Sequence, residues 1–307
     1  MEIKEPNFLV IGAGKSGTTS LYEYLNEHPE VFMSPIKETN FFALEGEQLE
    51  DQENDPEQMR HYPWSITDQE SYSDLFKDAG DHQAIGEVSP MYLYSKKAAF
   101  AIKKRMPRVK LIAILRQPTE RLYSRYLHLA REGRTLSSDI EDALDRKSIW
   151  WKRNDLVQEG FYHSHLNHYF NLFSEEQIHI VLYEDFRNNP QNVIEGIYKF
   201  IGVDPCFMPS MDTEYNVSGF VANANVDKII GQNSMVKSMI VKAAPSLAKY
   251  LSESRKVKSW VNQLRNRNLR RPPLSARLKR QINEIYSTEI IRLQVLINRD
   301  LSHWLTK

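Results

Sequence analysis

The chain has 307 residues, of which 41% are hydrophobic, 11% aromatic and 26% charged, and its 12 glycines and 14 prolines exclude a fibrous or disordered protein. The one cysteine, Cys206, excludes an intramolecular disulfide and a thiolate metal cluster, as expected in a reducing compartment. The first residues show no basic segment followed by a long apolar stretch, and nowhere do about 18 apolar residues run together. We therefore expect no signal peptide, no membrane span and a cytoplasmic location.

Charge is unevenly distributed along the chain, although the formal net charge is zero. Between Glu38 and Glu87, 14 acidic residues stand against two basic ones, whereas between Val217 and Arg271, 11 basic residues stand against two acidic ones. Such blocks are ordinarily solvated surface. The alternative is that the basic block binds a polyanionic ligand and the acidic block faces a cationic one. No nucleic-acid partner is predicted.

Hydrophobic periodicity predicts alternating strands and helices. The predicted elements are a strand at 7–12 and a helix after it, a strand at 109–115 and a helix after Pro118, a helix at 161–173, a strand at 178–183, and helices at 190–201 and 275–296. This alternation indicates an α/β fold in which helices cover a central parallel sheet. We expect one domain over residues 1–307, with an α/β core at 6–210, a basic helical lid or acceptor-side segment at 217–272, and a C-terminal helical segment at 273–307.

A glycine-rich turn separates the first strand from its helix, where an open parallel sheet places its ligand. Its sequence, from Gly12 to Ser20, is GAGKSGTTS. The turn matches the dinucleotide-binding fingerprint, but the expected second strand with an acidic end is missing. It does not match the Walker A motif, because Leu9 stands where that motif requires glycine. A third interpretation is that the Lys15 ammonium and the hydroxyls after it clamp a 5′-phosphate that carries a leaving group.

On these residues the sequence resembles the sulfotransferase superfamily, whose donor is 3′-phosphoadenosine 5′-phosphosulfate (PAPS). The resemblance implies a P-loop-like sulfotransferase fold in which the turn holds the 5′-phosphosulfate and Lys15 contacts the oxygen between sulfur and phosphorus. The implied ligands of this phosphosulfate are Lys15, Ser16, Gly17, Thr18, Thr19 and Ser20.

A second anchor for the donor follows the strand at 109–115. The family holds the 3′-phosphate with an arginine at a strand end and a serine in the next helix, and Arg116 and Ser124 match that pattern. Arg116 would supply a bidentate fork and Ser124 a hydroxyl donor. The alternative is that Arg116 pairs with Glu120. Two matches about 100 residues apart, in the expected order, make the resemblance specific.

The general base is predicted between these anchors. The segment from Lys37 to Phe42, KETNFF, is similar to a segment of the carbohydrate and heparan sulfate sulfotransferases in which the glutamate is the proposed base. By analogy Glu38 takes the acceptor's proton. The alternative is that Glu38 pairs with Lys37. Some relatives carry a histidine two residues later, where this chain has Asn40.

Several other residues are also candidates for the site. Glu87 lies in a stretch, GEVSPMY, that resembles a family motif, with Val88 where the family has lysine, and is a second candidate base. His128 follows Ser124 by one helical turn and is a candidate acceptor-side residue, as is Lys37. Arg270 and Arg271 precede the last helix and are candidate PAPS ligands.

The sequence thus predicts a PAPS-dependent sulfotransferase that needs no metal. The acceptor is expected to be a small molecule of secondary metabolism that offers a hydroxyl rather than an amine, and the acidic block suggests a cationic natural product. Two alternatives are a P-loop-like kinase, which would need Mg²⁺ and a Walker B aspartate, and a non-catalytic nucleotide-binding protein. Neither the oligomeric state nor the acceptor's identity is predicted.

Overall fold

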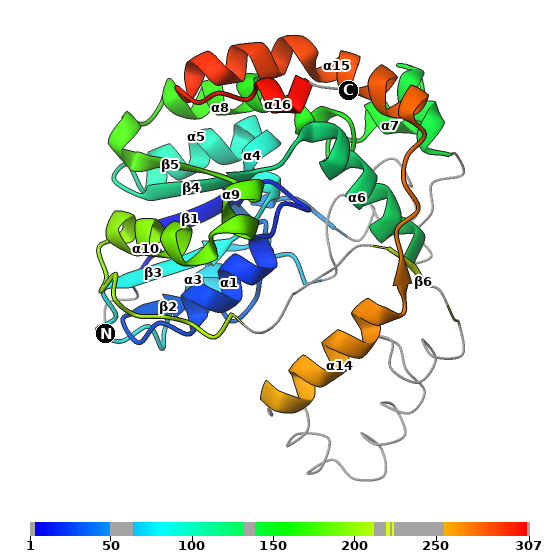
Figure 1. Ribbon diagram of the computed structural model, residues 1–307. Helices are drawn as coiled ribbons and strands as arrows, with labels where there is room; N and C mark the ends of the chain where they lie inside the picture. Colours follow the sequence, from blue (N-terminus) through cyan, green and yellow to red (C-terminus); the bar gives the residue numbers. More distant parts are fainter. Residues whose placement is uncertain are drawn as a thin grey trace. The chain divides into compact units, whose positions relative to one another are not determined.

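A computed structural model describes residues 4–49, 64–131, 139–211, 219–221, 223 and 255–305 of the chain (Figure 1). The chain divides into two compact units. The first comprises Met1–Tyr123, Leu136–Pro209 and Leu274–Lys307, and the second comprises Ser124–Thr135 and Ser210–Pro273. The single-domain organisation expected from the sequence stays a prediction.

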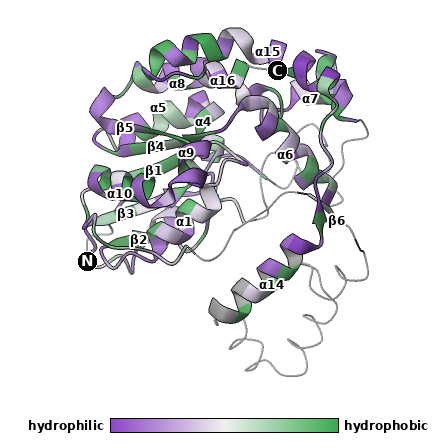
Figure 2. Cartoon of the chain, viewed as in Figure 1, coloured by the Kyte–Doolittle hydropathy of each residue, from purple (hydrophilic) through white to green (hydrophobic). Residues whose placement is uncertain are grey.

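A five-stranded parallel sheet forms the core of the first unit, in the order β2-β3-β1-β4-β5. The strands are β1 (Phe8–Gly12), β2 (Val31–Met33), β3 (Ala84–Val88), β4 (Lys110–Leu115) and β5 (Ile178–Leu182). In the central strand β1, Val10 is paired with Val88 of β3 and Ile112 of β4, and all three side chains are fully buried. Figure 2 shows hydrophobic residues gathered on β1 and β4, as expected for a parallel sheet covered on both faces.

Helices cover the sheet on both faces because its crossover connections run in opposite directions from the centre. The helices of the first half are α1 (Thr18–Asn26), α2 (Phe41–Leu44), α3 (Gln69–Asp74), α4 (Met91–Tyr94), α5 (Lys96–Arg105) and α6 (Pro118–Arg131). After these come η2 (Ile140–Leu144), α7 (Ile149–Lys152), η3 (Gln158–Gly160), α8 (Tyr162–Phe170), η4 (Glu175–Gln177), α9 (Tyr183–Asn188), α10 (Pro190–Ile201), α15 (Ala276–Leu296) and α16 (Ser302–Leu305). Figure 1 shows α1 and α10 in front of the sheet, whereas α4, α5, α8 and α15 form a separate packed layer.

The ends of two predicted helices are confirmed by their caps. Asn189 caps α10 ahead of Pro190, and Gly202 ends the helix in the left-handed conformation at φ 89°. Ser275 caps α15 by accepting the Leu278 N–H at 3.2 Å. The predicted α/β class with a central parallel sheet is also confirmed. Among the described helices, none is both long and apolar enough to cross a bilayer.

Strand β3 was not predicted, because its sequence AIGEV contains a glycine and a glutamate. Tertiary contacts explain both residues. A Cβ atom on Gly86 would lie 2.2 Å from the ring of Phe8 in the neighbouring strand, so no side chain fits there. Glu87 is fully buried, and hydroxyl groups surround its carboxylate. Strand β2 and helix α5 were also missed.

The second unit contains the end of α6, a two-stranded antiparallel pair and one helix. These are β6 (Phe220–Val221), β7 (Leu269–Arg270) and α14 (Arg255–Arg267). Asn268 and Asn223 exchange two hydrogen bonds of 3.0 Å beside the strand pair. Much of the segment 217–272 lies outside the described residues, so its role as a lid or acceptor-side segment stays a prediction.

Candidate functional site

The glycine turn connects the buried end of β1 to helix α1, as the sequence predicts. Gly17 is the N-cap of α1 at φ 94°, no side chain caps the helix, and its first turn contains no acidic residue. The first N–H groups of a helix have no partner within the helix, and the helix dipole makes this end positive. The nine-residue helix α1 therefore presents an N-terminus suited to an anion.

Ser16 supplies a second, independent sign of a ligand in this turn. Its side chain is fully buried, and its Oγ has no hydrogen-bond partner among the described residues. Such an orphaned hydroxyl costs free energy unless a ligand or water bonds it. The neighbouring Lys15 has φ 64°, an uncommon value for a residue other than glycine. Backbone conformations of this kind cost free energy, and they cluster at active sites and ligand-binding loops. The turn therefore fits the donor's phosphosulfate.

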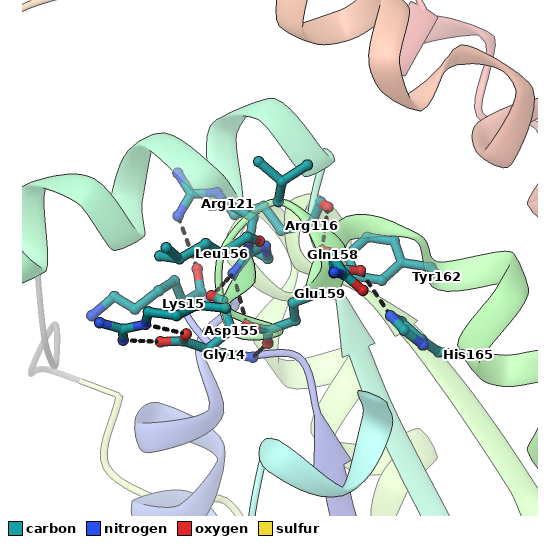
Figure 3. Close-up of polar contacts among 12 residues, drawn as sticks. Gly14, Lys15, Arg116, Arg121, Asp155, Leu156, Gln158, Glu159, Tyr162 and His165 are labelled. Atoms are coloured by element: carbon teal, nitrogen blue, oxygen red, sulfur yellow. Dashed lines mark hydrogen bonds and ion pairs between the residues drawn. The ribbon is translucent and has the colours of Figure 1, made fainter. Parts of the chain in front are cut away.

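Arg116 joins this turn from the end of the neighbouring strand β4. Its Nη1 donates a hydrogen bond of 3.0 Å to the carbonyl oxygen of Lys15 (Figure 3). Its guanidinium lies 4.6 Å from the ring centre of Tyr183. The pairing with Glu120 that the sequence left open is long, at 4.0 Å. The two anchors predicted from distant motifs thus lie side by side at the carboxyl edge of the sheet.

Glu38 and its neighbours are fixed to the end of β3, on the other side of β1. The Glu38 N–H donates to the Val88 carbonyl at 2.8 Å, and the Asn40 N–H donates to Ser89 Oγ at 3.1 Å. Glu38 and Asn40 both have positive φ, at 63° and 55°. Because β3 pairs with β1, this segment reaches the same sheet edge as the glycine turn.

The Glu38 carboxylate forms a salt bridge with Lys37, which is the alternative that the sequence left open. The side chains of Glu38 and Lys37 are 23% and 20% exposed, so both remain partly accessible to solvent. A carboxylate that pairs with a lysine can still accept a proton from an acceptor. The contact therefore fits a base whose charge is held in place, and the role of Glu38 stays a prediction.

Glu87 has a different environment. Its carboxylate accepts hydrogen bonds from Thr39 at 2.5 Å, Ser89 at 3.0 Å, Tyr92 at 2.6 Å and Tyr72 at 3.0 Å. Desolvation raises the pKa of this fully buried group, although the four hydroxyl donors act in the opposite direction. A carboxylate enclosed in this way has no room for an acceptor. The geometry disfavours Glu87 as the base and favours a structural role beside Glu38.

Four predicted site residues belong to the second unit. Ser124 is buried on α6, and His128 lies one turn further along, where its Nδ1 is 3.3 Å from an Arg131 nitrogen. Arg270 in β7 and Arg271 after it are exposed. Their roles toward donor and acceptor stay predictions.

Glu159 was not predicted as a site residue. Its carboxylate Oε1 accepts the Gly14 N–H at 2.6 Å (Figure 3). Its Oε2 accepts a 2.8 Å hydrogen bond from Arg121, whose side chain is fully buried. Glu159 and Gly14 are 145 residues apart. No local pattern could have connected them. The described residues contain no group of three or more His, Cys, Asp or Glu side chains placed to hold a metal ion.

Comparison with known proteins agrees with this geometry. A model of the sulfotransferase family matches residues 6–207. The bifunctional heparan sulfate N-deacetylase/N-sulfotransferase of Drosophila melanogaster is 28% identical over an alignment of 249 residues, with 73% of this chain and 22% of that protein covered. Carbohydrate sulfotransferase 15 of Mus musculus is 27% identical over 258 residues, with 65% of this chain and 44% of that protein covered. The chain thus spans less than half the length of both relatives.

A solved structure supports the fold. The sulfotransferase from Alicyclobacillus acidocaldarius superposes with a TM-score of 0.69 at 23% identity, covering 99% of this chain and 100% of that one. At this level of identity the likeness concerns the arrangement of the backbone, and it extends the agreement beyond residue 207.

Proposed function

Because this chain belongs to the sulfotransferase family, we propose that it transfers the sulfuryl group of PAPS to the hydroxyl of an acceptor. The observation that carries the proposal is the contact between Arg116 and the Lys15 carbonyl. The guanidinium lies beside an uncapped helix N-terminus, which supports the assignment of one anion-binding group to each phosphate of PAPS. Lys15 to Ser20 would hold the 5′-phosphosulfate, and Arg116 the 3′-phosphate.

The transfer is an in-line displacement at sulfur. The acceptor oxygen forms a bond to sulfur while the bond from sulfur to the bridging oxygen breaks, and the electron pair leaves with the phosphate of adenosine 3′,5′-bisphosphate. Glu38 takes the acceptor's proton, and the Lys15 ammonium and the α1 N-terminus stabilise the charge that develops on the phosphate. Positioning and electrostatics supply the catalysis, as in phosphoryl transfer.

The acceptor is proposed to be a small molecule, and the acidic block between Glu38 and Glu87 favours a cationic one. The two relatives named above act, by their names, on heparan sulfate and on carbohydrate, which makes a polyanionic polymer the competing class. Glutamine replacements of Glu45, Glu47 and Glu50 should raise KM for a cationic acceptor and leave KM for a neutral one unchanged. Equal KM values in wild type and variant for both acceptors would exclude the cationic class.

The first experiment is a thermal-shift titration with adenosine 3′,5′-bisphosphate, ADP, ATP with Mg²⁺, and NAD. A ligand at a hundredfold excess over its Kd stabilises the folded state by about 2.7 kcal/mol, which is readily detected. We expect selective stabilisation by the bisphosphate. Stabilisation by ATP with Mg²⁺ would favour a kinase, and NAD binding would favour a dinucleotide site. Bisphosphate binding without sulfuryl transfer to any acceptor class would favour a non-catalytic protein. The cytoplasmic location stays a prediction, tested by cell fractionation.

A further inference from the structure

A buried ion pair reaches the glycine turn from outside the residues that hold the donor. Glu159, in η3, divides its carboxylate between two donors, the Gly14 backbone N–H and the Arg121 guanidinium, as Figure 3 shows. The side chains of Arg121 and Glu159 are 0% and 4% exposed. Gly14 lies in the turn that leads from β1 into Lys15. The ion pair therefore touches the backbone of the proposed phosphosulfate loop directly.

A gain in the free energy of unfolding does not explain well why this ion pair is buried here. Burying two charges costs about as much as their attraction returns, and apolar residues of similar volume often serve equally well. A carboxylate beside an anion-binding loop also repels the anion, and Arg121 offsets that repulsion by neutralising its charge. What the carboxylate contributes beyond an apolar residue is a directed hydrogen bond to Gly14.

The segment that carries Glu159 is itself tied down. Arg121 also donates to the carbonyl oxygens of Asp155, at 3.3 Å, and of Leu156. Arg153 pairs with the Asp155 carboxylate through hydrogen bonds of 3.0 and 2.7 Å. With its backbone held in this way, Glu159 provides a fixed acceptor, so the Gly14 N–H has one favoured direction.

Gly14 is matched to this acceptor. A Cβ atom on Gly14 would lie 3.0 Å from Glu159 Oε1, tighter than an ordinary contact. A side chain at this position would push the carboxylate away from the N–H that it binds. Glu159 therefore explains why residue 14 is a glycine. Gly14 directly precedes Lys15, so the orientation of the Gly14 backbone affects how the chain enters the left-handed conformation of Lys15, at φ 64°.

We propose that Glu159, with its charge compensated by Arg121, is a positioning residue that holds the glycine turn in the conformation that receives the donor's phosphosulfate. This inference rests on the proposed function. Glu159 contacts neither reactant, so its influence acts through the Gly14 N–H and the Lys15 backbone. The pair should affect donor affinity and leave acceptor affinity alone.

The test is Glu159→Gln, with adenosine 3′,5′-bisphosphate affinity measured by calorimetry well below the melting temperature. Glutamine keeps the shape but replaces one acceptor oxygen by an NH₂ group, and both oxygens are in use. We expect bisphosphate affinity to fall on the order of tenfold, since the lost hydrogen bond involves a charged group. KM for PAPS should rise to a similar extent, and KM for the acceptor should not change.

Glu289→Gln is the matched control, because Glu289 on α15 is also a buried glutamate whose two carboxylate oxygens each accept a hydrogen bond, one of them from a backbone N–H. Its partner is Ser164 of α8, with bonds of 3.0 and 2.7 Å. It should lower the melting temperature but change bisphosphate affinity less than twofold. An equal loss of affinity in Glu289→Gln would overturn the proposal, because a general loosening of the fold would then explain both variants. Wild-type affinity in Glu159→Gln would also overturn it.

Gly14→Ala approaches the same contact from the turn and leaves both charges in place, so it serves if Glu159→Gln does not fold. We expect it to weaken bisphosphate binding on the order of tenfold, and to have less effect in a Glu159→Ala background, since contacting residues are not additive. Full additivity would contradict the proposal. If wild type itself does not bind the bisphosphate, the proposed function is wrong. If wild type binds it and the variants bind it equally well, only the positioning role of Glu159 is wrong.

Discussion

Arg116 donates a hydrogen bond of 3.0 Å to the carbonyl oxygen of Lys15, so the two predicted phosphate anchors are physically joined. The guanidinium follows β4 and the lysine follows β1, and these neighbouring parallel strands end at the same edge. The ring of Tyr183 lies against the guanidinium and orients it. A substitution of either residue should therefore alter the position of the other.

Arg116→Ala should abolish the stabilisation that adenosine 3′,5′-bisphosphate confers, because it removes a charged donor and releases the Lys15 carbonyl. The measurement is a thermal-shift titration at a ligand excess that gives about 2.7 kcal/mol in wild type. Arg280→Ala, at an exposed position of α15, is the control and should retain the full shift. A wild-type shift in Arg116→Ala would remove this residue from the donor site.

Lys15→Ala should lower kcat by about 10²- to 10³-fold, the loss that follows removal of a preorganised charge stabiliser. Single-turnover measurements with saturating PAPS separate this chemical effect from donor binding. A variant whose kcat is intact but whose KM for PAPS is raised would show that Lys15 binds the donor equally in the ground and transition states.

Glu38→Gln should lower kcat by roughly 10²- to 10⁴-fold, the usual contribution of a general base. Bisphosphate affinity should remain that of wild type, because a general base would act on the acceptor and not on the donor. Glu195→Gln is the matched control, since Glu195 also pairs with a lysine, Lys199, but on the surface of α10. If Glu38→Gln retained wild-type kcat, the base would have to be sought elsewhere.

Gly17→Ala and Gly196→Ala should change stability in opposite directions. Gly17 has φ 94°, and a Cβ atom there would approach Phe186 to 3.3 Å, so alanine should destabilise the fold by about 1–3 kcal/mol. Gly196 lies within α10, and a Cβ atom there would meet nothing within 4 Å. Alanine should stabilise that helix by roughly 0.5–1 kcal/mol. Chemical denaturation measures both, and equal effects would contradict the assigned backbone conformations.

Glu87 should make the free energy of unfolding depend on pH. Burial raises its pKa above the ordinary value of 4.5, so between 4.5 and the raised pKa the folded state binds a proton that the unfolded state has lost. Stability therefore falls as pH rises through this window and levels off above it. Denaturation of wild type and Glu87→Gln at several pH values gives the free energy of unfolding of each protein. The difference, wild type minus Glu87→Gln, should decrease with rising pH. A difference that is constant, or that increases with pH, would show that the hydroxyl donors outweigh burial.

Much of the candidate site could be predicted from the sequence because its residues lie in short contiguous motifs. The turn from Gly12 to Ser20 and the stretch that begins at Arg116 each follow a buried strand, and parallel strands bring their carboxyl ends to one edge. The strand and helix pattern was sufficient for this inference. The structure agrees, since Lys15 and Arg116 are in contact.

The tertiary structure decided what joins residues that no local pattern connects. Glu87 looks like an ordinary candidate base in its motif, yet the fold encloses it with hydroxyls from Thr39, Tyr72 and Tyr92. Glu159 has no motif at all, and it meets Gly14 across 145 residues of chain. The sequence by itself determined the α/β fold class and the sheet edge at which the glycine turn and Arg116 lie, because local periodicity and backbone preference depend on neighbouring residues. Burial and long-range hydrogen bonds depend on packing, so only the folded chain assigned the carboxylates their environments.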